Sequence, residues 1–264
     1  GPSILLKRTI RKQLRVMKCK KRGTYMIAAM ILAGGTGSRV GLDRPKQFVE
    51  ILGKPVIAYT IEIYEKCEEI DTIQVVCHKE WKEYLKEIVR LYNFTKVKWI
   101  VDGGETYQQS VMNGIDNLKN YISADDMVMI HYGAAPFTSQ QIINDAIEVC
   151  RKHGNSVSCT PCYQLMGTKD DDKISTKWVD RDKYIQIACP QSFKFDYLLS
   201  VYERADEKNL IADTEPHTTS LMYALGDTIY QSYSDQTNIK ITTKEDLYMF
   251  EGYVLMKNKH NNER

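Results

Sequence analysis

Short apolar stretches rich in β-branched residues recur along the chain, and longer amphipathic segments separate them. The apolar stretches lie at residues 26–32, 72–77, 97–101, 127–130 and 156–160. Each has the length of a strand that is buried on both faces of a sheet. Because such strands alternate with helical segments, the pattern predicts an α/β fold with a mostly parallel, twisted sheet and helices on both faces.

The amphipathic segments carry the signals of helices. Residues 56–67 place Ile57, Ile61 and Tyr64 on one face, as expected for a helix that packs against the sheet. Two later segments open with capping-box spacing, in which a threonine precedes a glutamine or glutamate by three residues. These pairs are Thr106 with Gln109 and Thr242 with Glu245. We therefore expect a helix to begin after each threonine.

A polar and charged stretch interrupts the alternation of strands and helices. Residues 167–182 contain few apolar side chains, and β-strand character resumes only at 184–188. This stretch predicts a β-arm at about residues 163–188 that projects from the core. Since projecting arms commonly exchange between subunits, we expect a homodimer.

Length and composition fit one domain. A chain of 264 residues with 43% hydrophobic content can bury one large core. We expect this domain at residues 26–258, with a basic leader at 1–25 and a polar tail at 259–264. The leader holds nine Lys or Arg residues and no acid, so subtracting its charge from the formal net charge of +2 leaves about −7 for the rest. An acidic body does not favour nucleic acid as a partner.

The leader and the cysteines indicate where in the cell the protein works. The leader's apolar run is too short for a signal peptide, and the chain holds no apolar segment of 18 residues, which predicts a cytoplasmic protein. We interpret the leader as a disordered extension that begins with a protease-cleavage remnant, Gly1 and Pro2; a basic arm on anionic membranes is the alternative. Seven irregularly spaced cysteines fit a reducing compartment. Cys159 and Cys162 lack a second pair for a zinc site.

A glycine-rich turn at residues 32–48, LAGGTGSRVGLDRPKQF, holds the strongest chemical signal. The glycines at 34, 35 and 37 let main-chain amides approach an anion closely, because no Cβ intervenes. Arg39 and Lys46 add positive charge beside those amides, and Pro45 restricts where Lys46 lies. Such a site suits a polyphosphate that loses pyrophosphate as it reacts, so the turn predicts nucleotidyl transfer.

Three other interpretations of this turn are weaker. A P-loop requires a Gly-Lys-Ser/Thr ending that the turn lacks, which argues against ATPase or GTPase chemistry of that type. A dinucleotide fingerprint that starts at Gly35 meets Val40 where the third glycine should be. A plain turn with solvated charges does not explain two spaced cations with a proline directly before one of them.

The chain resembles the cytidylyltransferase family that includes methylerythritol-phosphate cytidylyltransferase and ribitol-5-phosphate cytidylyltransferase. Five segments carry the resemblance: residues 32–48, 103–115, 130–137, 179–193 and 238–247. Their order and spacing follow the family over residues 26–256, and the first loop is closer to the ribitol-phosphate branch. The resemblance implies a Rossmann-like nucleotidyltransferase fold.

The resemblance also implies a reaction. CMP would pass from CTP to a polyol phosphate, most of all a pentitol phosphate such as ribitol 5-phosphate. Pyrophosphate would leave, and the CDP-polyol would serve surface polysaccharide synthesis. Mg²⁺, largely held by the nucleotide phosphates, is the implied cofactor. Methylerythritol phosphate, the acceptor of isoprenoid synthesis, is the alternative substrate, and a catalytically silent nucleotide-binding homologue is the alternative class.

Site residues follow from the resemblance position by position. The implied catalytic cations are Arg39, Lys46 and Lys240. The implied nucleotide-binding residues are Leu32, Ala33, Gly34, Gly35, Thr36, Gly37, Gly103, Ser110, His131 and Tyr132. The implied acceptor-binding residues are Arg181, which would reach across the dimer, Asp213 and Glu215. His217 is interpreted as an incidental loop residue.

Three positions depart from the family pattern. Tyr132 stands where the family has an aspartate that helps to hold the magnesium ion, and Tyr107 and Ala135 stand where arginines are usual. A neutral phenol is a poor ligand for Mg²⁺. The site could hold the ion through the triphosphate and one carboxylate, take a different nucleotide or acceptor, or no longer catalyse. The carboxylates considered are Asp213, Glu215 and Asp235. Because the cations remain, we expect a divergent active enzyme.

Overall fold

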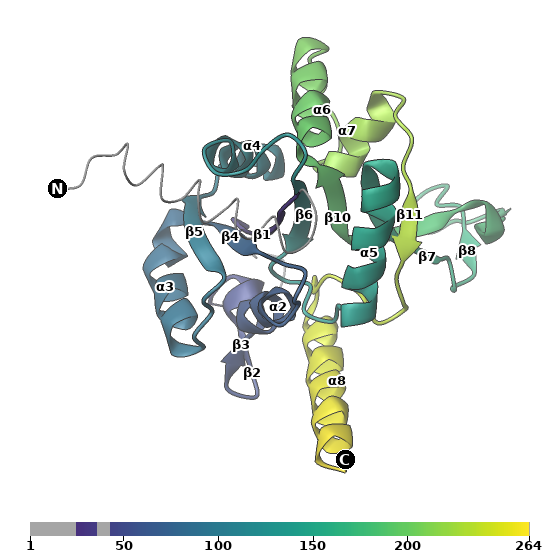
Figure 1. Cartoon of the computed structure of the whole chain (residues 1–264). Coiled ribbons are helices and arrows are strands. Elements are labelled where there is room, and N and C mark those ends of the chain that lie inside the picture. The colour runs from purple at the N-terminus through teal and green to yellow at the C-terminus, as the bar shows by residue number, and fades with distance from the viewer. Residues whose placement is uncertain (1–24, 36–42, 264) are drawn as a thin grey trace.

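A seven-stranded sheet forms the centre of the protein (Figure 1). The computed structural model describes residues 25–35 and 43–263. The strand order is β11-β7-β10-β6-β1-β4-β5, and β10 is antiparallel to both of its neighbours whereas the other pairs are parallel. The strands are β1 (Ile27–Ala33), β4 (Thr72–Cys77), β5 (Val97–Asp102), β6 (Met127–Tyr132), β7 (Asn155–Pro161), β10 (Ile185–Lys194) and β11 (Gln231–Tyr233). The predicted mostly parallel sheet is confirmed.

Helices cover both faces of the sheet, as predicted. Side chains alternate along β1, so that Ala29 and Ile31 join the core beneath one layer of helices while Ala28 and Met30 join the core beneath the other. The first layer comprises α2 (Val56–Glu65), α3 (Lys82–Leu91) and α5 (Gln140–His153). The second comprises α4 (Tyr107–Leu118), α6 (Phe195–Glu207) and α7 (Thr218–Ala224). Burial on both sides explains why β1 is a continuous apolar run and why β4 is mostly apolar.

The predicted helix signals hold with one shift of register. Ile57, Ile61 and Tyr64 of α2 are fully buried, and the Thr106 hydroxyl caps α4 by accepting the Gln109 N–H at 3.1 Å. The last helix, α8 (Lys244–Asn262), is capped by Thr243 with Asp246 rather than by Thr242 with Glu245. The Asp246 carboxylate accepts the N–H groups of both threonines, so the shorter acid completes the box one residue later.

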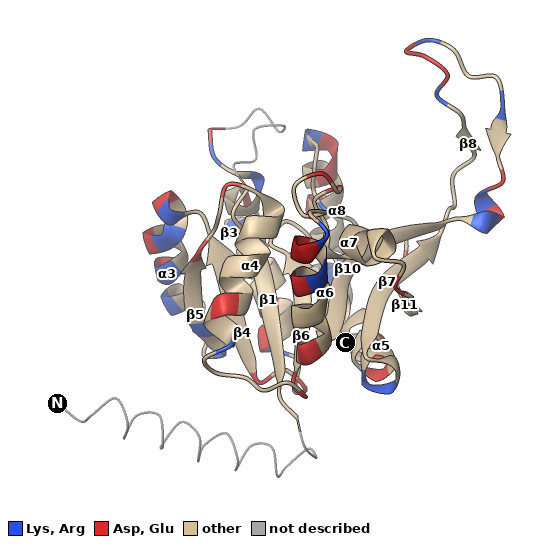
Figure 2. Ribbon diagram, turned by 90° about the horizontal axis from the view of Figure 1, so that it is seen from above, with Lys and Arg blue, Asp and Glu red and all other residues tan. Residues whose placement is uncertain are grey.

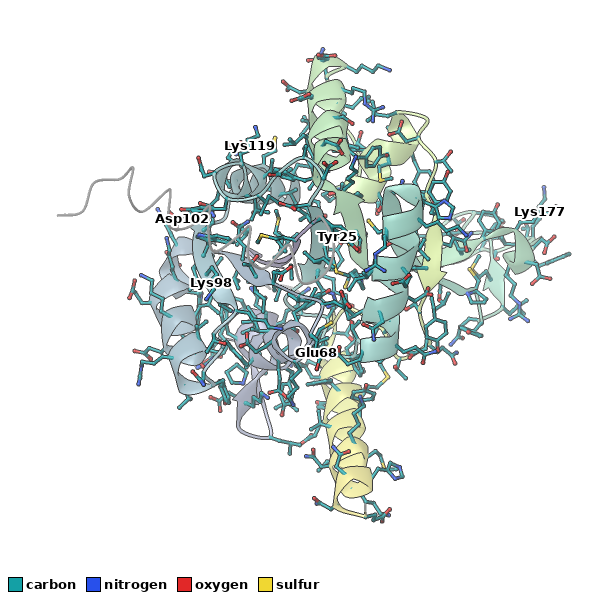
Figure 3. All side chains as sticks on the ribbon, viewed as in Figure 1. Tyr25, Glu68, Lys98, Asp102, Lys119 and Lys177 are labelled. Atoms are coloured by element: carbon teal, nitrogen blue, oxygen red, sulfur yellow. The ribbon has the colours of Figure 1, made fainter. Side chains whose placement is uncertain are left out.

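An arm extends from the sheet edge, as predicted (Figure 2). Its strands β8 (Met166–Gly167) and β9 (Trp178–Val179) pair antiparallel, and the short helix η4 (Arg181–Lys183) follows them. Lys177 on this arm and Lys119 beyond α4 lie at the periphery of the molecule (Figure 3). The role of the arm in a dimer stays a prediction.

Two further features complete the fold. The short helices η2 (Lys46–Phe48) and η3 (Lys79–Trp81) and the hairpin of β2 (Glu50–Ile51) and β3 (Lys54–Pro55) lie outside the main sheet. Helix α8 packs on a third apolar cluster through Leu247 and Phe250 and extends through Asn262, so residues 259–262 continue the helix. Within the described ranges, no helix combines the length and apolar character that crossing a membrane requires.

Candidate active site

Two adjoining cavities lie at the carboxyl ends of the parallel strands β1 and β6. The smaller, here called the glycine cavity, has a volume of about 210 Å³ and is lined by Gly34, Gly35 and Lys46, among others. The larger, the acceptor-side cavity, measures about 600 Å³ and includes residues of β10 and α7. Tyr132 and Lys240 line both cavities. Ligands of open α/β sheets bind at this edge, so the two cavities are the strongest candidates for substrate sites.

Close backbone packing shapes the glycine cavity. A Cβ on Gly103 would lie 3.3 Å from the Cα of Gly34, and a Cβ on Gly34 would lie 3.0 Å from the Ser110 hydroxyl oxygen. That hydroxyl accepts the Gly104 N–H at 3.0 Å. Side chains at either glycine would therefore push the two turns apart. Ser110, predicted to contact the nucleotide, lines the cavity and also holds the second turn in place.

Lys46 is fixed beside the glycines by its neighbours in the chain. Pro45, with φ of −55°, precedes it, and Lys46 is the first residue of η2. The buried Gln47 side chain donates to the carbonyl oxygens of Ala33 at 3.2 Å and Gly35 at 3.0 Å. These two bonds tie η2 to the end of β1, which places Lys46 in the cavity wall. Nothing in the sequence pattern marks Gln47 for this role.

Lys240 reaches the same cavity from the distant loop before α8. The Ile241 N–H donates to the Ala134 carbonyl at 2.8 Å. On the other side of Lys240, the buried Asn238 donates to the Cys189 carbonyl at 2.8 Å. The Lys240 ammonium lies 4.3 Å from the centre of the Tyr132 ring, a cation–π contact. Two predicted catalytic cations, Lys46 and Lys240, therefore meet at one cavity.

Several predicted site residues fall elsewhere or outside the description. Thr36, Gly37 and Arg39 lie outside the described residues. The remaining members of the predicted nucleotide cradle line the glycine cavity or form its closely packed turns, namely Leu32, Gly34, Gly35, Gly103, Ser110 and Tyr132. Ala33 is buried at the end of β1, where its carbonyl accepts from Gln47.

His131 is an internal support rather than a lining residue. It is fully buried, with Nε2 at 2.8 Å from the Ala135 carbonyl and Nδ1 at 2.7 Å from the Tyr64 hydroxyl. A carbonyl only accepts, so Nε2 carries the proton. Burial lowers the pKa of His131 to about 4 and keeps it neutral. The His131 side chain therefore lines neither cavity and fixes the turn after β6. The contribution of this residue to nucleotide binding stays a prediction.

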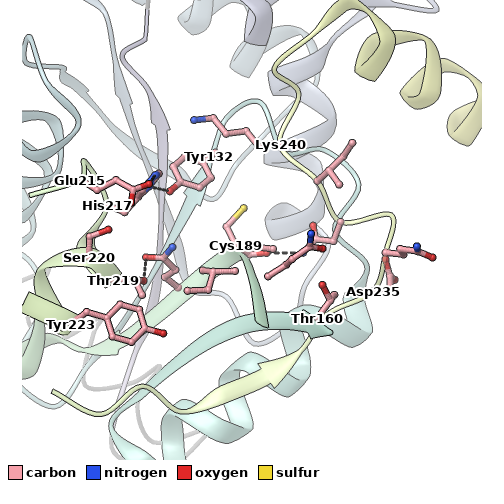
Figure 4. Close-up of a pocket in the computed structure, with 17 residues that line it drawn as sticks. Tyr132, Thr160, Cys189, Glu215, His217, Thr219, Ser220, Tyr223, Asp235 and Lys240 are labelled. Carbon is pink, nitrogen blue, oxygen red and sulfur yellow. Dashed lines mark hydrogen bonds and ion pairs between the residues drawn. The ribbon is translucent and has the colours of Figure 1, made fainter. Parts of the chain in front are cut away.

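A neutral aromatic group occupies the junction of the two cavities. The Tyr132 hydroxyl lies 2.5 Å from Nδ1 of His217, and the Tyr107 ring lies 6.1 Å from the Tyr132 ring and 5.5 Å from the His217 ring. Burial raises the pKa of Tyr132 and lowers the pKa of His217, so both are uncharged near neutral pH. Figure 4 shows His217 beside both Tyr132 and Glu215. The interpretation of His217 as incidental misses this bond.

The residues around the cavities do not fit a magnesium ion held by the protein. The described ranges contain no group of three or more His, Cys, Asp or Glu side chains arranged for a metal. Glu215 and Asp235 line the acceptor-side cavity, but Glu215 lies 3.7 Å from His217 and Asp235 accepts from Thr237. Tyr132 is a neutral phenol, which is a poor ligand for Mg²⁺. Asp213 does not line either cavity.

Arg181 lies apart from both cavities. It begins η4 on the exposed arm, and its guanidinium donates to the Tyr163 carbonyl at 2.5 Å. Within one subunit it contributes to neither cavity wall. Its predicted contact with the acceptor phosphate requires a second subunit and stays a prediction.

Known proteins resemble this chain over most of its length. The model of the family IspD, 2-C-methyl-D-erythritol 4-phosphate cytidylyltransferase, matches residues 27–256. A ribitol-5-phosphate cytidylyltransferase of Lacticaseibacillus paracasei is 34% identical over 87% of this chain and 98% of its own. A 2-C-methyl-D-erythritol 4-phosphate cytidylyltransferase of Clostridium acetobutylicum is 37% identical over 86% of this chain and 96% of its own.

A solved structure shares the fold. The 4-diphosphocytidyl-2C-methyl-D-erythritol synthase of Anaerococcus prevotii superposes with a TM-score of 0.71 at 25% sequence identity, over 88% of this chain and 99% of its own. The predicted family resemblance is thereby confirmed by sequence and by structure.

Proposed function

Because the chain belongs to the 2-C-methyl-D-erythritol 4-phosphate cytidylyltransferase family, we propose that it transfers CMP from CTP to a pentitol phosphate such as ribitol 5-phosphate. The names of relatives such as the Lacticaseibacillus paracasei protein support this acceptor. One observation carries the proposal: Lys240 and Tyr132 line both cavities, so a nucleotide in one and an acceptor in the other would meet beside a cation.

The reaction needs no protein nucleophile. An oxygen of the acceptor phosphate attacks the α-phosphorus of CTP, a new P–O bond forms, and the bond from the α-phosphorus to the bridging oxygen of pyrophosphate breaks. The packed glycines bring main-chain groups to the triphosphate, and Lys46 and Lys240 stabilise charge on the reacting and departing phosphates. The electron pair leaves with pyrophosphate, so no acid or base is required for bond cleavage.

Three further parts of the proposal concern the setting of the reaction. Any Mg²⁺ would arrive on the CTP phosphates, since the described residues provide no carboxylate cluster. A homodimer through the arm is supported by exposed apolar side chains there, which include Leu165, 81% exposed, and Trp178, 73% exposed. A cytoplasmic enzyme that makes CDP-polyol for surface polysaccharide remains our expectation.

Pyrophosphate release tests the proposal. CTP is incubated with Mg²⁺ and, in turn, ribitol 5-phosphate, other pentitol phosphates and methylerythritol phosphate, while calorimetry measures CTP binding. Turnover with a pentitol phosphate supports the proposal. Turnover with methylerythritol phosphate alone favours the second candidate, which the 37% identity to the Clostridium acetobutylicum protein supports. CTP binding without pyrophosphate release from any acceptor would identify a silent homologue and reject the proposed reaction.

A further inference from the structure

Helix α8 carries an apolar stripe on its outward face. Tyr248, Met249, Leu255 and Met256 are 70%, 53%, 53% and 54% exposed. They lie opposite Leu247 and Phe250, which bury the other face of α8 in the core. Figure 1 shows the C-terminal part of α8 extending beyond the body of the protein. A helix this exposed on one side with an apolar stripe is typical of a helix that packs against another chain.

The stripe has a two-fold pattern centred on Gly252. The spacing from Glu245 through 248, 252 and 255 to Lys259 is three, four, three and four residues, which is the spacing of a helix–helix seam. If two copies of α8 lie antiparallel with Gly252 facing Gly252, Tyr248 faces Met256 and Met249 faces Leu255. Among the residues that the structure describes, a Cβ at Gly252 would meet no atom within 4 Å. The centre of the stripe is therefore free to approach another helix.

The charged residues at the two ends of the stripe are also placed symmetrically about Gly252. Glu245 and Lys259 each lie seven residues from Gly252, so antiparallel pairing brings Glu245 of each copy opposite Lys259 of the other. Neither residue forms an ion pair within the described part of the chain. Parallel pairing would instead place like charges together. The antiparallel arrangement also opposes the two helix dipoles favourably.

We propose that α8 binds α8 of a second copy of this chain, antiparallel, about a two-fold axis at Gly252. The pattern favours a second copy because an isologous interface requires a self-complementary surface, and this stripe is self-complementary in both apolar and charged positions. An α8 of 19 residues is about 28 Å long. Such a pair buries less than a standard interface of about 800 Å² per partner, so we infer a concentration-dependent contact that adds to any contact through the arm.

A cysteine at the two-fold axis tests the proposal in the full chain. Facing helices whose axes lie about 8–10 Å apart, with Cα radii of about 2.3 Å, bring two Cα atoms at the axis to within roughly 3.5–5.5 Å. The upper part of this range overlaps the roughly 4.4–6.8 Å between Cα atoms at which disulfides form. We expect Gly252→Cys to give a reducible covalent dimer under mild oxidation. Asn258→Cys is the matched control, because it is equally exposed on α8 but lies off the stripe, and wild type reports any cross-linking by native cysteines.

Charge reversal in the Gly252→Cys background provides a second test of the same interface. Glu245→Lys alone and Lys259→Glu alone should each reduce cross-linking about tenfold, because both contacts in either homodimer become repulsive. Mixing the two variants should restore it, since each contact again joins a lysine to a glutamate. Circular dichroism checks that each variant is folded. The proposal is overturned if Gly252→Cys cross-links no more than Asn258→Cys, or if the mixture cross-links no more than either variant alone.

Discussion

Lys240→Ala provides the most direct test of the proposed reaction. Lys240 lines both cavities, and its ammonium lies 4.3 Å from the centre of the Tyr132 ring. A phosphate charge about 4 Å from the Lys240 ammonium would interact with it by about 4 kcal/mol at an effective dielectric constant of about 20. Since each 1.36 kcal/mol is a factor of about ten in rate, loss of the ammonium should lower kcat about 10²–10³-fold, the usual cost of one well-placed electrostatic group.

The backbone around Lys240 should survive the substitution. The bonds from Ile241 to Ala134 and from Asn238 to Cys189 do not involve the lysine side chain. We therefore expect the melting temperature to change by only a few degrees, which separates a chemical effect from a folding effect. Lys244→Ala is the control, because Lys244 is exposed at the start of α8 and lines neither cavity.

The assay is pyrophosphate release at saturating CTP with the best acceptor. A kcat that falls by less than about threefold in Lys240→Ala, with the fold intact, would refute the idea that this cation acts on the reacting phosphates. Lys240→Arg distinguishes charge from shape: it should retain more activity than Lys240→Ala if charge dominates, and equal losses would point to packing against Tyr132.

Three further predictions concern the supporting residues. Gln47→Ala, which removes the two bonds that tie η2 to β1, should raise the KM for CTP several-fold in the same assay, and an unchanged KM would argue that Lys46 is placed without them. Tyr132→Phe keeps the ring beneath Lys240 but removes the hydroxyl bonded to His217, so we expect a larger change in acceptor KM than in CTP KM. His131 has a pKa depressed to about 4, so the unfolded state binds its proton first as pH falls. Stability should therefore drop by about 3 kcal/mol between pH 6.5 and pH 4, and denaturant unfolding should show a smaller drop in His131→Gln.

Periodicity was sufficient to predict most of the fold. The strand from Thr72 to Cys77 is found with the predicted bounds, because a strand buried on both faces is mostly apolar. Its buried polar side chain Gln74 is satisfied by hydrogen bonds to Gly114 and Asn117. The short edge strand β11 was not predicted: in Gln231–Tyr233 only the central Ser232 is buried, so no apolar pattern marks it. The register of the last capping box was also missed, since Thr242 and Thr243 are both followed three residues later by an acid and only packing selects between them.

The site was predicted less completely, for a physical reason. Lys46 and Lys240 are 194 positions apart in the chain, and the family resemblance, not local pattern, linked them. Gln47 acts by donating hydrogen bonds to main-chain carbonyls, which accept from any suitably placed N–H, so its residue type carries little signal. A histidine beside a cavity residue suggests a chemical role. The alternation of side chains along β6, however, points His131 into the core while Tyr132 faces the cavities.

The same alternation explains how the site tolerates a tyrosine at position 132. The neutral phenol bonds to the neutral His217 and contacts the Lys240 ammonium through its ring. Tyr107 packs against both rings and bonds through its hydroxyl to Thr218 at 3.2 Å. Each of these neutral polar groups is satisfied by another, so the junction of the two cavities needs no acidic side chain to complete its hydrogen bonds. The aromatic side chains therefore complete the junction without charge of their own, and Lys240 supplies the positive charge where the two cavities meet.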